Sequence, residues 1–472
     1  MNRTNSKCYV NNPIKWKHLP LQTLPMTKVG KKWRKTKVEA LLSAINYYFC
    51  LSLSKSMAHI IIKNIGPIKH VELDLNKINV FMGPQSSGKS TIAKIISFCL
   101  WVEKNVCLFR DTLDIELNFQ KILEDYHQLH GYFDRESYIH YKTEYVVIDF
   151  RAKQERATIL TREMKQNALD YKRSKIIYVP AERNLIALPY WTTFKLSDDN
   201  LKSYASDWNF VRSMFNKEIP LHIKPLNVSY YYDERERKDY ISLSDKNRPI
   251  ILTDSSSGIQ SATSLYLLNK VYCQYREKLS EFSSIEDEET FSKVYKEQLY
   301  YSTIREDPDD IPESDRFFYK KRFLVVKPGT KEKAIRILDN YTEIQYIQSI
   351  IEEPELNLFP DTQQALMYEL MADAVVSDNR MVITTHSPYI LFALNNCVMG
   401  GLVGKNIPEE KKSTFPSFAS WIDPSLVSVY EIHDGTIKCI QDEDGIIEDN
   451  YLNQAYKKNS DEYLSLLDYY EE

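Results

Sequence analysis

One short segment constrains the fold of this chain more than any other: an apolar run leads into a glycine-containing loop and then a helical pattern. The run is Ile78 to Met82, and the next nine residues read G-P-Q-S-S-G-K-S-T. In the order strand, loop, helix, the pattern G-x-x-x-x-G-K-S cradles phosphate, because backbone N–H groups and a helix N-terminus point at one anion. We therefore predict an α/β fold built around a phosphate-binding loop, or P-loop.

The side chains of this loop suit a nucleoside triphosphate. Lys89 places a positive charge beside the β- and γ-phosphates, Ser90 supplies a hydroxyl for Mg²⁺, and Thr91 is placed for the α-phosphate. The chain has only 12 glycines, so two of them at the required positions argue against a chance turn. With ATP and Mg²⁺ as the cofactors, the predicted nucleotide-binding residues are Gly83, Pro84, Gln85, Ser86, Ser87, Gly88, Lys89, Ser90 and Thr91.

Two later apolar runs end in residues fit for hydrolysis. Residues 350–355 read I-I-E-E-P-E, where Glu352 would hold the Mg²⁺ hydration shell and Glu353 would polarise the attacking water. A second run, 381–385, leads into His386, whose imidazole can contact the γ-phosphate. Taken alone, the acids suit a surface connection and the histidine a structural role, but behind a P-loop we predict Lys89, Glu353 and His386 to be catalytic.

A serine-rich segment lies between these motifs. Residues 253–261 read T-D-S-S-S-G-I-Q-S and precede an apolar helical pattern. Ser257 and Gly258 at an exposed helix N-terminus would suit a phosphate, although any serine cluster also makes an ordinary helix N-cap. We include both residues among the predicted nucleotide contacts.

The order P-loop, S-S-G-I-Q, E-E-P-E, H-S-P resembles the ABC-type ATPases, within them the DNA-associated branch with SMC and RecF, and most of all the overcoming-lysogenization-defect (OLD) family. The resemblance implies that Ser257 and Gly258 reach ATP held by a second chain, so the expected assembly is a homodimer or an oligomer of dimers. It also implies a separate effector such as a nuclease, in phage defence or DNA repair, with DNA as a candidate ligand. The residues that carry it are 57–104, 175–183, 253–272 and 344–395.

Three positions depart from the family pattern. The metal-side acid is Glu352 rather than Asp, and Ile259 stands where the signature has a second glycine. The segment from Ile176 to Arg183 resembles the strand and turn of a Q-loop, but Ala181 stands where glutamine is expected. Either Glu182 or Arg183 would then have to take over the glutamine's role.

Composition excludes several classes of protein. The hydrophobic share is 43% and the charged share 27%, both ordinary for a globular protein. No apolar run approaches the roughly 18 residues of a membrane span, so we expect no membrane insertion. Seven scattered cysteines without C-x-x-C favour a reducing, cytoplasmic setting, and no Cys–His or carboxylate–His cluster supports zinc.

The motifs divide the chain into segments. Residues 1–56 hold eleven Lys or Arg and one acid. We consider four interpretations of this head: a nucleic-acid or phosphate-binding arm, a targeting peptide, a solvated tail, and sequence upstream of a true start at Met57. We favour the last. The expected division is 1–56 basic extension, 57–183 ATPase lobe with the P-loop, 184–274 helical lobe with the signature, 275–343 insertion, 344–395 the acid pair and histidine, and 396–472 C-terminal segment.

Four functions compete at this point. The favoured one is an ATP-hydrolysing dimeric switch, and the main alternative is an ATP-sensing scaffold that barely hydrolyses. A transporter ATPase is disfavoured by E-E-P-E and the insertion. A nuclease within the chain would need a TOPRIM acid upstream of the D-x-D-like Asp442 to Asp444, and the chain has no such Glu-Gly.

Overall fold

The computed structural model describes most of the chain after residue 57. The described residues are 58–109, 112–161, 171–188, 199–243, 248–275, 292, 316–319, 322–326 and 329–470. The basic head, residues 1–56, lies outside them, as does most of the insertion expected at 275–343.

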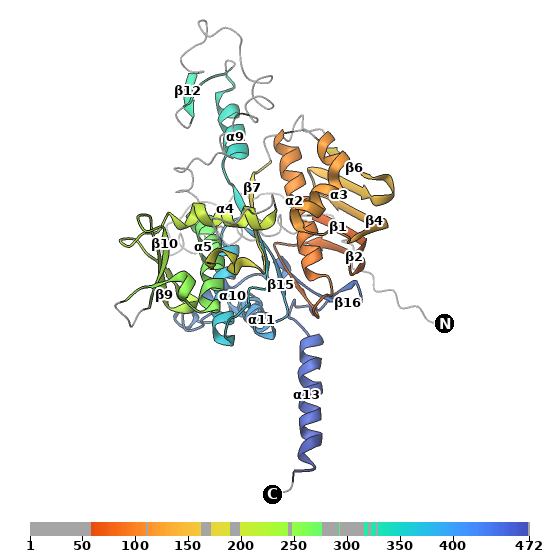
Figure 1. Ribbon diagram of the computed structural model, residues 1–472, viewed down its shortest axis with the longest axis vertical. Coiled ribbons are helices and arrows are strands. Elements are labelled where there is room, and N and C mark those ends of the chain that lie inside the picture. Colours follow the sequence, from red (N-terminus) through yellow and green to blue (C-terminus); the bar gives the residue numbers. More distant parts are fainter. Residues whose placement is uncertain are drawn as a thin grey trace, which may run out of the picture. The chain divides into compact units, whose positions relative to one another are not determined.

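An eleven-stranded mixed sheet forms the centre of the fold (Figure 1). Its order is β6-β5-β4-β1-β2-β17-β16-β3-β15-β14-β7. Strands β16, β3, β15, β14 and β7 run parallel, whereas β6, β5, β4, β1 and β2 pair antiparallel. The strands are β1 Ala58–Ile65, β2 Ile68–Leu75, β3 Ile78–Met82, β4 Phe133–Lys142, β5 Val146–Arg151, β6 Arg156–Thr161, β7 Ser174–Val179, β14 Tyr346–Glu352, β15 Arg380–Thr385, β16 Val427–His433 and β17 Thr436–Cys439.

Helices cover both faces of the sheet, which explains why β3 and β14 are buried along their whole length. Side chains of β3 alternate between two cores: Val80 packs with α5, α10 and α11, and Phe81 with α2 and α3. The predicted α/β P-loop fold with a mixed sheet is confirmed. The helices are α2 Lys89–Phe109, α3 Leu113–His127, α4 Asn200–Arg212, α5 Ser257–Gln274, α9 Lys331–Thr342, α10 Pro360–Val375, α11 Pro388–Val403, α12 Glu409–Lys412 and α13 Tyr451–Leu467.

The segment 184–274 is not the purely helical lobe that we expected. Besides α4 and α5 it contains an antiparallel sheet of order β11-β10-β9-β8. Val228 and Tyr230 of β9 are buried, and a short polar turn joins β9 to β10, so the two strands form an antiparallel hairpin. The strands are β8 Leu221–Ile223, β9 Val228–Asp233, β10 Lys238–Leu243 and β11 Ile250–Ile251.

The described part of the insertion is a hairpin of β12, Arg316–Tyr319, and β13, Arg322–Val325, followed by α9. Buried residues of α9 pack with Cys107 and Leu108 at the end of α2.

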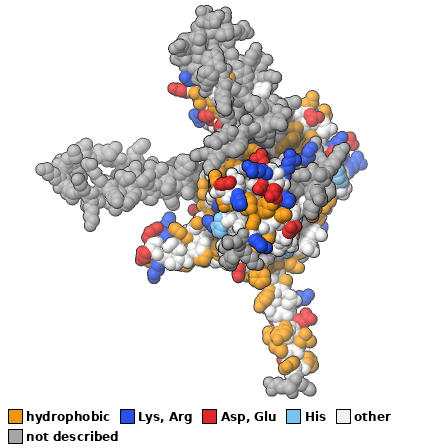
Figure 2. All heavy atoms as spheres, turned by 60° about the vertical axis from the view of Figure 1, so that its left-hand side comes forward, with side chains coloured by type: hydrophobic (Ala, Val, Ile, Leu, Met, Phe, Trp, Pro, Cys, Tyr) orange, Lys and Arg blue, Asp and Glu red, His pale blue; other side chains and the backbone are white. Residues whose placement is uncertain are grey.

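The C-terminal segment completes the central sheet, because β16 pairs with β3, the strand that leads into the P-loop, and β17 pairs with β2. Helix α13 follows and has no buried residue. Hydrophobic side chains lie along its surface (Figure 2). Among the described residues, no helix is long and apolar enough to cross a membrane.

Candidate nucleotide-binding and hydrolysis site

The P-loop connects the end of β3 to the start of α2, as its sequence predicts. Gly83 has φ +150° and Gly88 φ +105°, backbone conformations that side chains disfavour. A Cβ on Gly83 would lie 2.5 Å from the carbonyl oxygen of Ile432 in β16. The neighbouring strand therefore leaves room at this position only for glycine.

Lys89 is buried and folds back across the loop. Its Nζ donates to the carbonyl oxygens of Gly83, at 2.8 Å, and Pro84, at 2.7 Å. Burial lowers the pKa of Lys89, and the nearby carboxylates of Glu353 and Glu355 act in the opposite direction. The lysine thus lies where the loop closes on itself, the position from which it can contact a bound phosphate.

Glu352, the last residue of β14, lies beside the first turn of α2. Its Oε2 is 3.2 Å from Oγ of Ser90, and its Oε1 accepts a hydrogen bond from the Tyr178 hydroxyl of β7. Burial raises the pKa of Glu352, and both hydrogen bonds oppose that effect. A hydroxyl and a carboxylate so close together provide the oxygen ligands that Mg²⁺ prefers, so Ser90 and Glu352 fit the expected metal.

Glu353 follows the strand and is about half-buried. Its backbone has φ +44°, which is uncommon for a residue with a side chain. The guanidinium of Arg183, itself fully buried, donates to the carbonyl oxygen of Glu352 at 2.8 Å and to that of Glu353 at 2.7 Å.

His386, directly after β15, lies beside the acid pair. Its Nδ1 is 3.5 Å from Oε1 of Glu353 and 3.4 Å from Oε1 of Glu355. The interaction with Glu353 raises the pKa of His386 and lowers that of Glu353. Glu353 is therefore ionised at neutral pH, as a general base must be.

Glu355, the third acid of E-E-P-E, was not among the predicted site residues. It is buried, and its Oε1 accepts hydrogen bonds from Oγ1 of Thr385, at 2.7 Å, and from the backbone N–H of His386, at 2.8 Å. Glu355 thus joins the end of β15 to the segment after β14. Its place in the motif was the available signal.

The predicted signature begins a helix. Helix α5 starts at Ser257, and the side chain of Ser256 accepts a hydrogen bond from the N–H of Ile259. Ser257 is exposed, and the side-chain amide of Gln260 donates to the carbonyl oxygens of Thr253 and Ser255. Within the described part of the chain, no hydrogen bond or ion pair joins this segment to the P-loop.

Residues 57–391, more than half of the chain, match the family model described as an AAA ATPase domain. The chain belongs to this family. It is an ATPase, as its motifs predict, and the match spans the P-loop, the signature, the acid pair and His386.

Solved structures similar to this ATPase share little sequence with it. The SMC head domain from Thermotoga maritima is 11% identical with a TM-score of 0.34, over 82% of this chain and 98% of that one. The recombination mediator RecF is 10% identical, TM-score 0.28, over 82% and 100%. A dimeric bacterial ABC transporter cassette is 12% identical, TM-score 0.26, over 80% and 96%. Curated protein sequences give no match.

The structure distinguishes between the two residues that could replace the missing Q-loop glutamine. Ala181 and Glu182 follow β7, and Glu182 is exposed. Arg183 begins a 3₁₀ turn, Arg183–Ala187, and uses its donors on backbone carbonyls of its own chain. Of the two predicted substitutes for the missing glutamine, only Glu182 has an exposed side chain.

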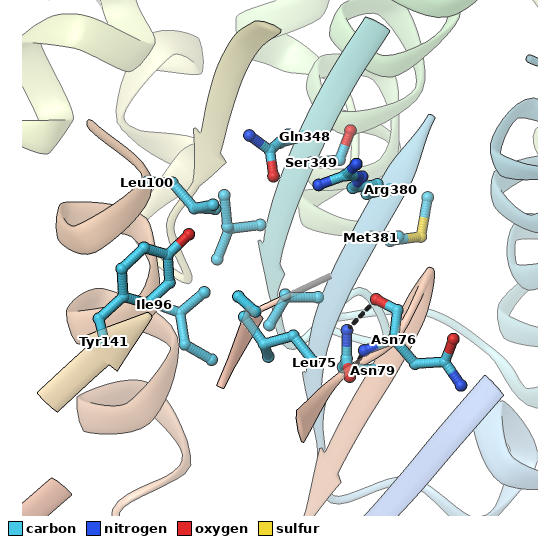
Figure 3. Close-up of a pocket in the computed structure, with 13 residues that line it drawn as sticks. Leu75, Asn76, Asn79, Ile96, Leu100, Tyr141, Gln348, Ser349, Arg380 and Met381 are labelled. Carbon is cyan, nitrogen blue, oxygen red and sulfur yellow. Dashed lines mark hydrogen bonds between the residues drawn. The ribbon is translucent and has the colours of Figure 1, made fainter. Parts of the chain in front are cut away.

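A pocket between α2 and the sheet does not belong to this site (Figure 3). Its lining includes Asn79, Gln348 and Arg380, from the amino-terminal halves of β3, β14 and β15. The P-loop, the acids and His386 follow the carboxyl ends of the same strands, where open α/β sheets bind ligands. Asn79 caps the turn before β3, since its amide donates to the carbonyl oxygen of Asn76 at 2.7 Å.

The D-x-D-like acids also have a local explanation. Oδ1 of Asp442 accepts hydrogen bonds from the N–H groups of Asp444 and Ile446, which makes it the cap of a turn. Among the described residues, no group of three or more His, Cys, Asp or Glu side chains is arranged to hold a metal ion.

Proposed function

We propose that this ATPase is a two-chain switch in which each ATP is held between the P-loop of one chain and the signature of another. One contrast carries the proposal. The P-loop, Glu352, Glu353 and His386 converge within a single chain, whereas Ser257 is exposed at a helix N-terminus with no bond to them. A helix N-terminus attracts phosphate, so a second copy would bring this group to the γ-phosphate.

The chemistry follows from the residues of one chain. Backbone N–H groups of the loop and Lys89 bind the phosphates, and Glu353 accepts a proton from the attacking water. His386 borders the same carboxylate and would contact the γ-phosphate. Bound to Ser90 and Glu352, Mg²⁺ would neutralise charge on the β- and γ-phosphates.

A mixing experiment tests the two-chain site. Lys89→Ala removes the P-loop cation, and Ser257→Arg obstructs the signature without disturbing packing, because Ser257 is exposed. Each variant should be inactive alone. Mixed chains should regain activity, because one of the two sites then combines an intact P-loop with an intact signature.

Glu234→Arg in an exposed turn is the matched control and should leave hydrolysis unchanged. If Ser257→Arg alone hydrolyses ATP at the native rate, the signature is not part of the site. The same holds if inactive variants never complement each other in any ratio.

The finer proposal is that the ATP-bound dimer controls a separate effector protein, such as a nuclease, or a DNA transaction. It is supported only by the resemblance to the OLD, SMC and RecF ATPases. ATP-loaded Glu353→Gln chains should retain such a partner or duplex DNA, and Lys89→Ala chains should not. Equal retention by both variants would count against ATP control.

The alternative is a scaffold that senses ATP with little hydrolysis. Ile259 in the signature and Ala181 in the Q-loop favour it, because both replace residues that the family pattern uses around the γ-phosphate. A native turnover number no higher than that of Glu353→Gln would support the scaffold.

A further inference from the structure

The backbone of Glu353 needs an explanation of its own. A left-handed φ of +44° is costly for a residue with a Cβ, and the residue before a proline has its backbone restricted further; here Pro354 follows. Such a conformation persists only where the surroundings over-determine it, and it tends to mark functional sites. The residue proposed to carry the base, Glu353, therefore has a strained backbone conformation.

Three hydrogen bonds hold the backbone on the two sides of Glu353. The N–H of Glu353 donates to the carbonyl oxygen of Thr384 at 2.9 Å, which ties it to β15. From the opposite side, Nη1 of Arg183 donates to the carbonyl oxygen of Glu352 and Nη2 to that of Glu353. A planar guanidinium can bind two consecutive carbonyls in this way, and a lysine ammonium cannot reproduce the fork.

The burial of Arg183 argues against a role in packing alone. The side chain has no exposed surface, and its remaining Nη1 contact is the carbonyl oxygen of Pro180 at 3.3 Å. No carboxylate is hydrogen-bonded to it, and its Nε has no partner among the described residues. A buried cation without a bonded anion is a costly way to fill space, since an apolar side chain of similar volume is usually at least as stable.

We propose that Arg183 is a positioning residue that holds the backbone of Glu353 in its left-handed conformation, so that the Glu353 carboxylate lies beside His386 and the P-loop. The inference rests on the proposed role of Glu353 as the base. Arg183 itself has no exposed surface. Its effect reaches the reaction only through the placement of the carboxylate, and a misplacement of about 1 Å can cost about 10²-fold in rate.

The test uses the full chain with Arg183→Lys, which keeps the charge and loses the fork. The turnover number at saturating ATP should fall about 10- to 100-fold, while the Kd for a fluorescent ATP analogue stays within about threefold. In the Glu353→Gln background the same substitution should have no further effect on single-turnover hydrolysis, because the group that it positions is gone. Arg212→Lys is the control: that arginine keeps only 12% of its side chain exposed and pairs with Asp239 in the β9–β10 sheet, so turnover should not change.

The outcomes separate the two proposals. If Glu353→Gln hydrolyses ATP at the native rate, the base assignment fails. If Glu353→Gln is inactive while Arg183→Lys retains native turnover, the positioning role is wrong. A further loss in the double variant also overturns it, because Arg183 would then act by another route. Should Arg183→Lys bind no ATP analogue, Arg183→Ala with added guanidinium decides: recovered turnover supports the role, and recovered binding without recovered turnover contradicts it.

Discussion

Two parts of the nucleotide site differ: the hydrolytic residues that follow β14 and β15, and the signature at the start of α5. A single chain assembles the first part but, among the described residues, leaves the second without a bond to it. At the ends of β14 and β15, polar side chains are buried and bonded to one another: Glu352 to Ser90 and Tyr178, and Glu355 to Thr385. At the start of α5, by contrast, Ser257 is exposed, and the hydrogen bonds of Gln260 run to Thr253 and Ser255 within the same segment.

This difference has a physical basis. Most buried polar groups in proteins are hydrogen-bonded, and the hydrolytic part accordingly forms a connected network. An exposed helix N-terminus is satisfied by water and can exchange that water for a phosphate at little cost. The first part is therefore sensitive to any single substitution, and the second should respond mainly to the arrival of another chain.

The largest effect is expected from Glu353→Gln, which removes the proposed base and keeps the size of the side chain. Turnover should fall by about 10²- to 10⁴-fold, the usual contribution of a positioned base. Binding of ATP should persist, so the variant should accumulate as an ATP-dependent dimer. Phosphate release and mass measurement with and without ATP check both points.

The control is Glu410→Gln on exposed α12, which should behave as the native chain. A Glu353→Gln chain that loses ATP binding together with turnover would show that the carboxylate is structural. The connected part of the site would then no longer be identified as the part that carries out hydrolysis.

The sequence predicted those site residues that belong to short motifs of consecutive residues. The P-loop, the acid pair and His386 each follow a strand, so their meeting could be predicted once those strands were placed side by side. Arg183 could not be assigned, because its contacts with Glu352 and Glu353 depend on β7 lying next to β14, some 170 residues away in sequence. The β9–β10 hairpin was missed because residues 228–232, V-S-Y-Y-Y, do not alternate between apolar and polar, and because the apolar pattern after 260 favoured a helical lobe.

The second prediction concerns packing at the signature. A Cβ on Gly258 would lie 2.5 Å from the carbonyl oxygen of Asn357, a backbone atom that cannot move cheaply. Gly258→Ala should lower the free energy of unfolding by about 1–3 kcal/mol. Ser257→Ala, one residue earlier and exposed, should change it by less than about 0.5 kcal/mol.

Urea unfolding of both variants measures the difference. Equal stabilities would mean that the start of α5 yields easily. The signature would then be as loosely held as its exposure implies, and Gly258 would be available to a second chain rather than committed to Asn357.

A smaller effect is expected from Tyr178→Phe. Without the hydroxyl, a buried carboxylate loses a hydrogen bond, which should cost about 1–2 kcal/mol of stability. That bond also holds the pKa of Glu352 down against burial. In the variant the acid should therefore be protonated at higher pH, and more Mg²⁺ should be needed for half-maximal activity as the pH falls.

Thermal unfolding and Mg²⁺ titrations between pH 6 and 8 test this prediction. Tyr126→Phe is a matched control, because its hydroxyl bonds only Ser203, outside the site. An unchanged Mg²⁺ requirement in Tyr178→Phe would mean that Glu352 needs no help from β7.

The smallest effect concerns the pH dependence of the His386–Glu353 pair. The pKa of His386 in the folded chain is raised above its ordinary value of 6.5 by Glu353, and that of Glu353 is lowered below 4.5. The stabilisation from protonated His386 is therefore complete below pH 6.5 and lost as the pH rises through the raised value, while the Glu353 contribution is lost only in acid. With 42% of the histidine side chain exposed, the pair should contribute less than about 1 kcal/mol.

The difference in unfolding free energy between the native chain and His386→Ala should be largest near pH 5–6 and shrink toward pH 8. A difference that is flat across this range would mean that the histidine is uncharged beside Glu353 in the free protein. The ion pair would then contribute nothing to the stability of the hydrolytic part of the site.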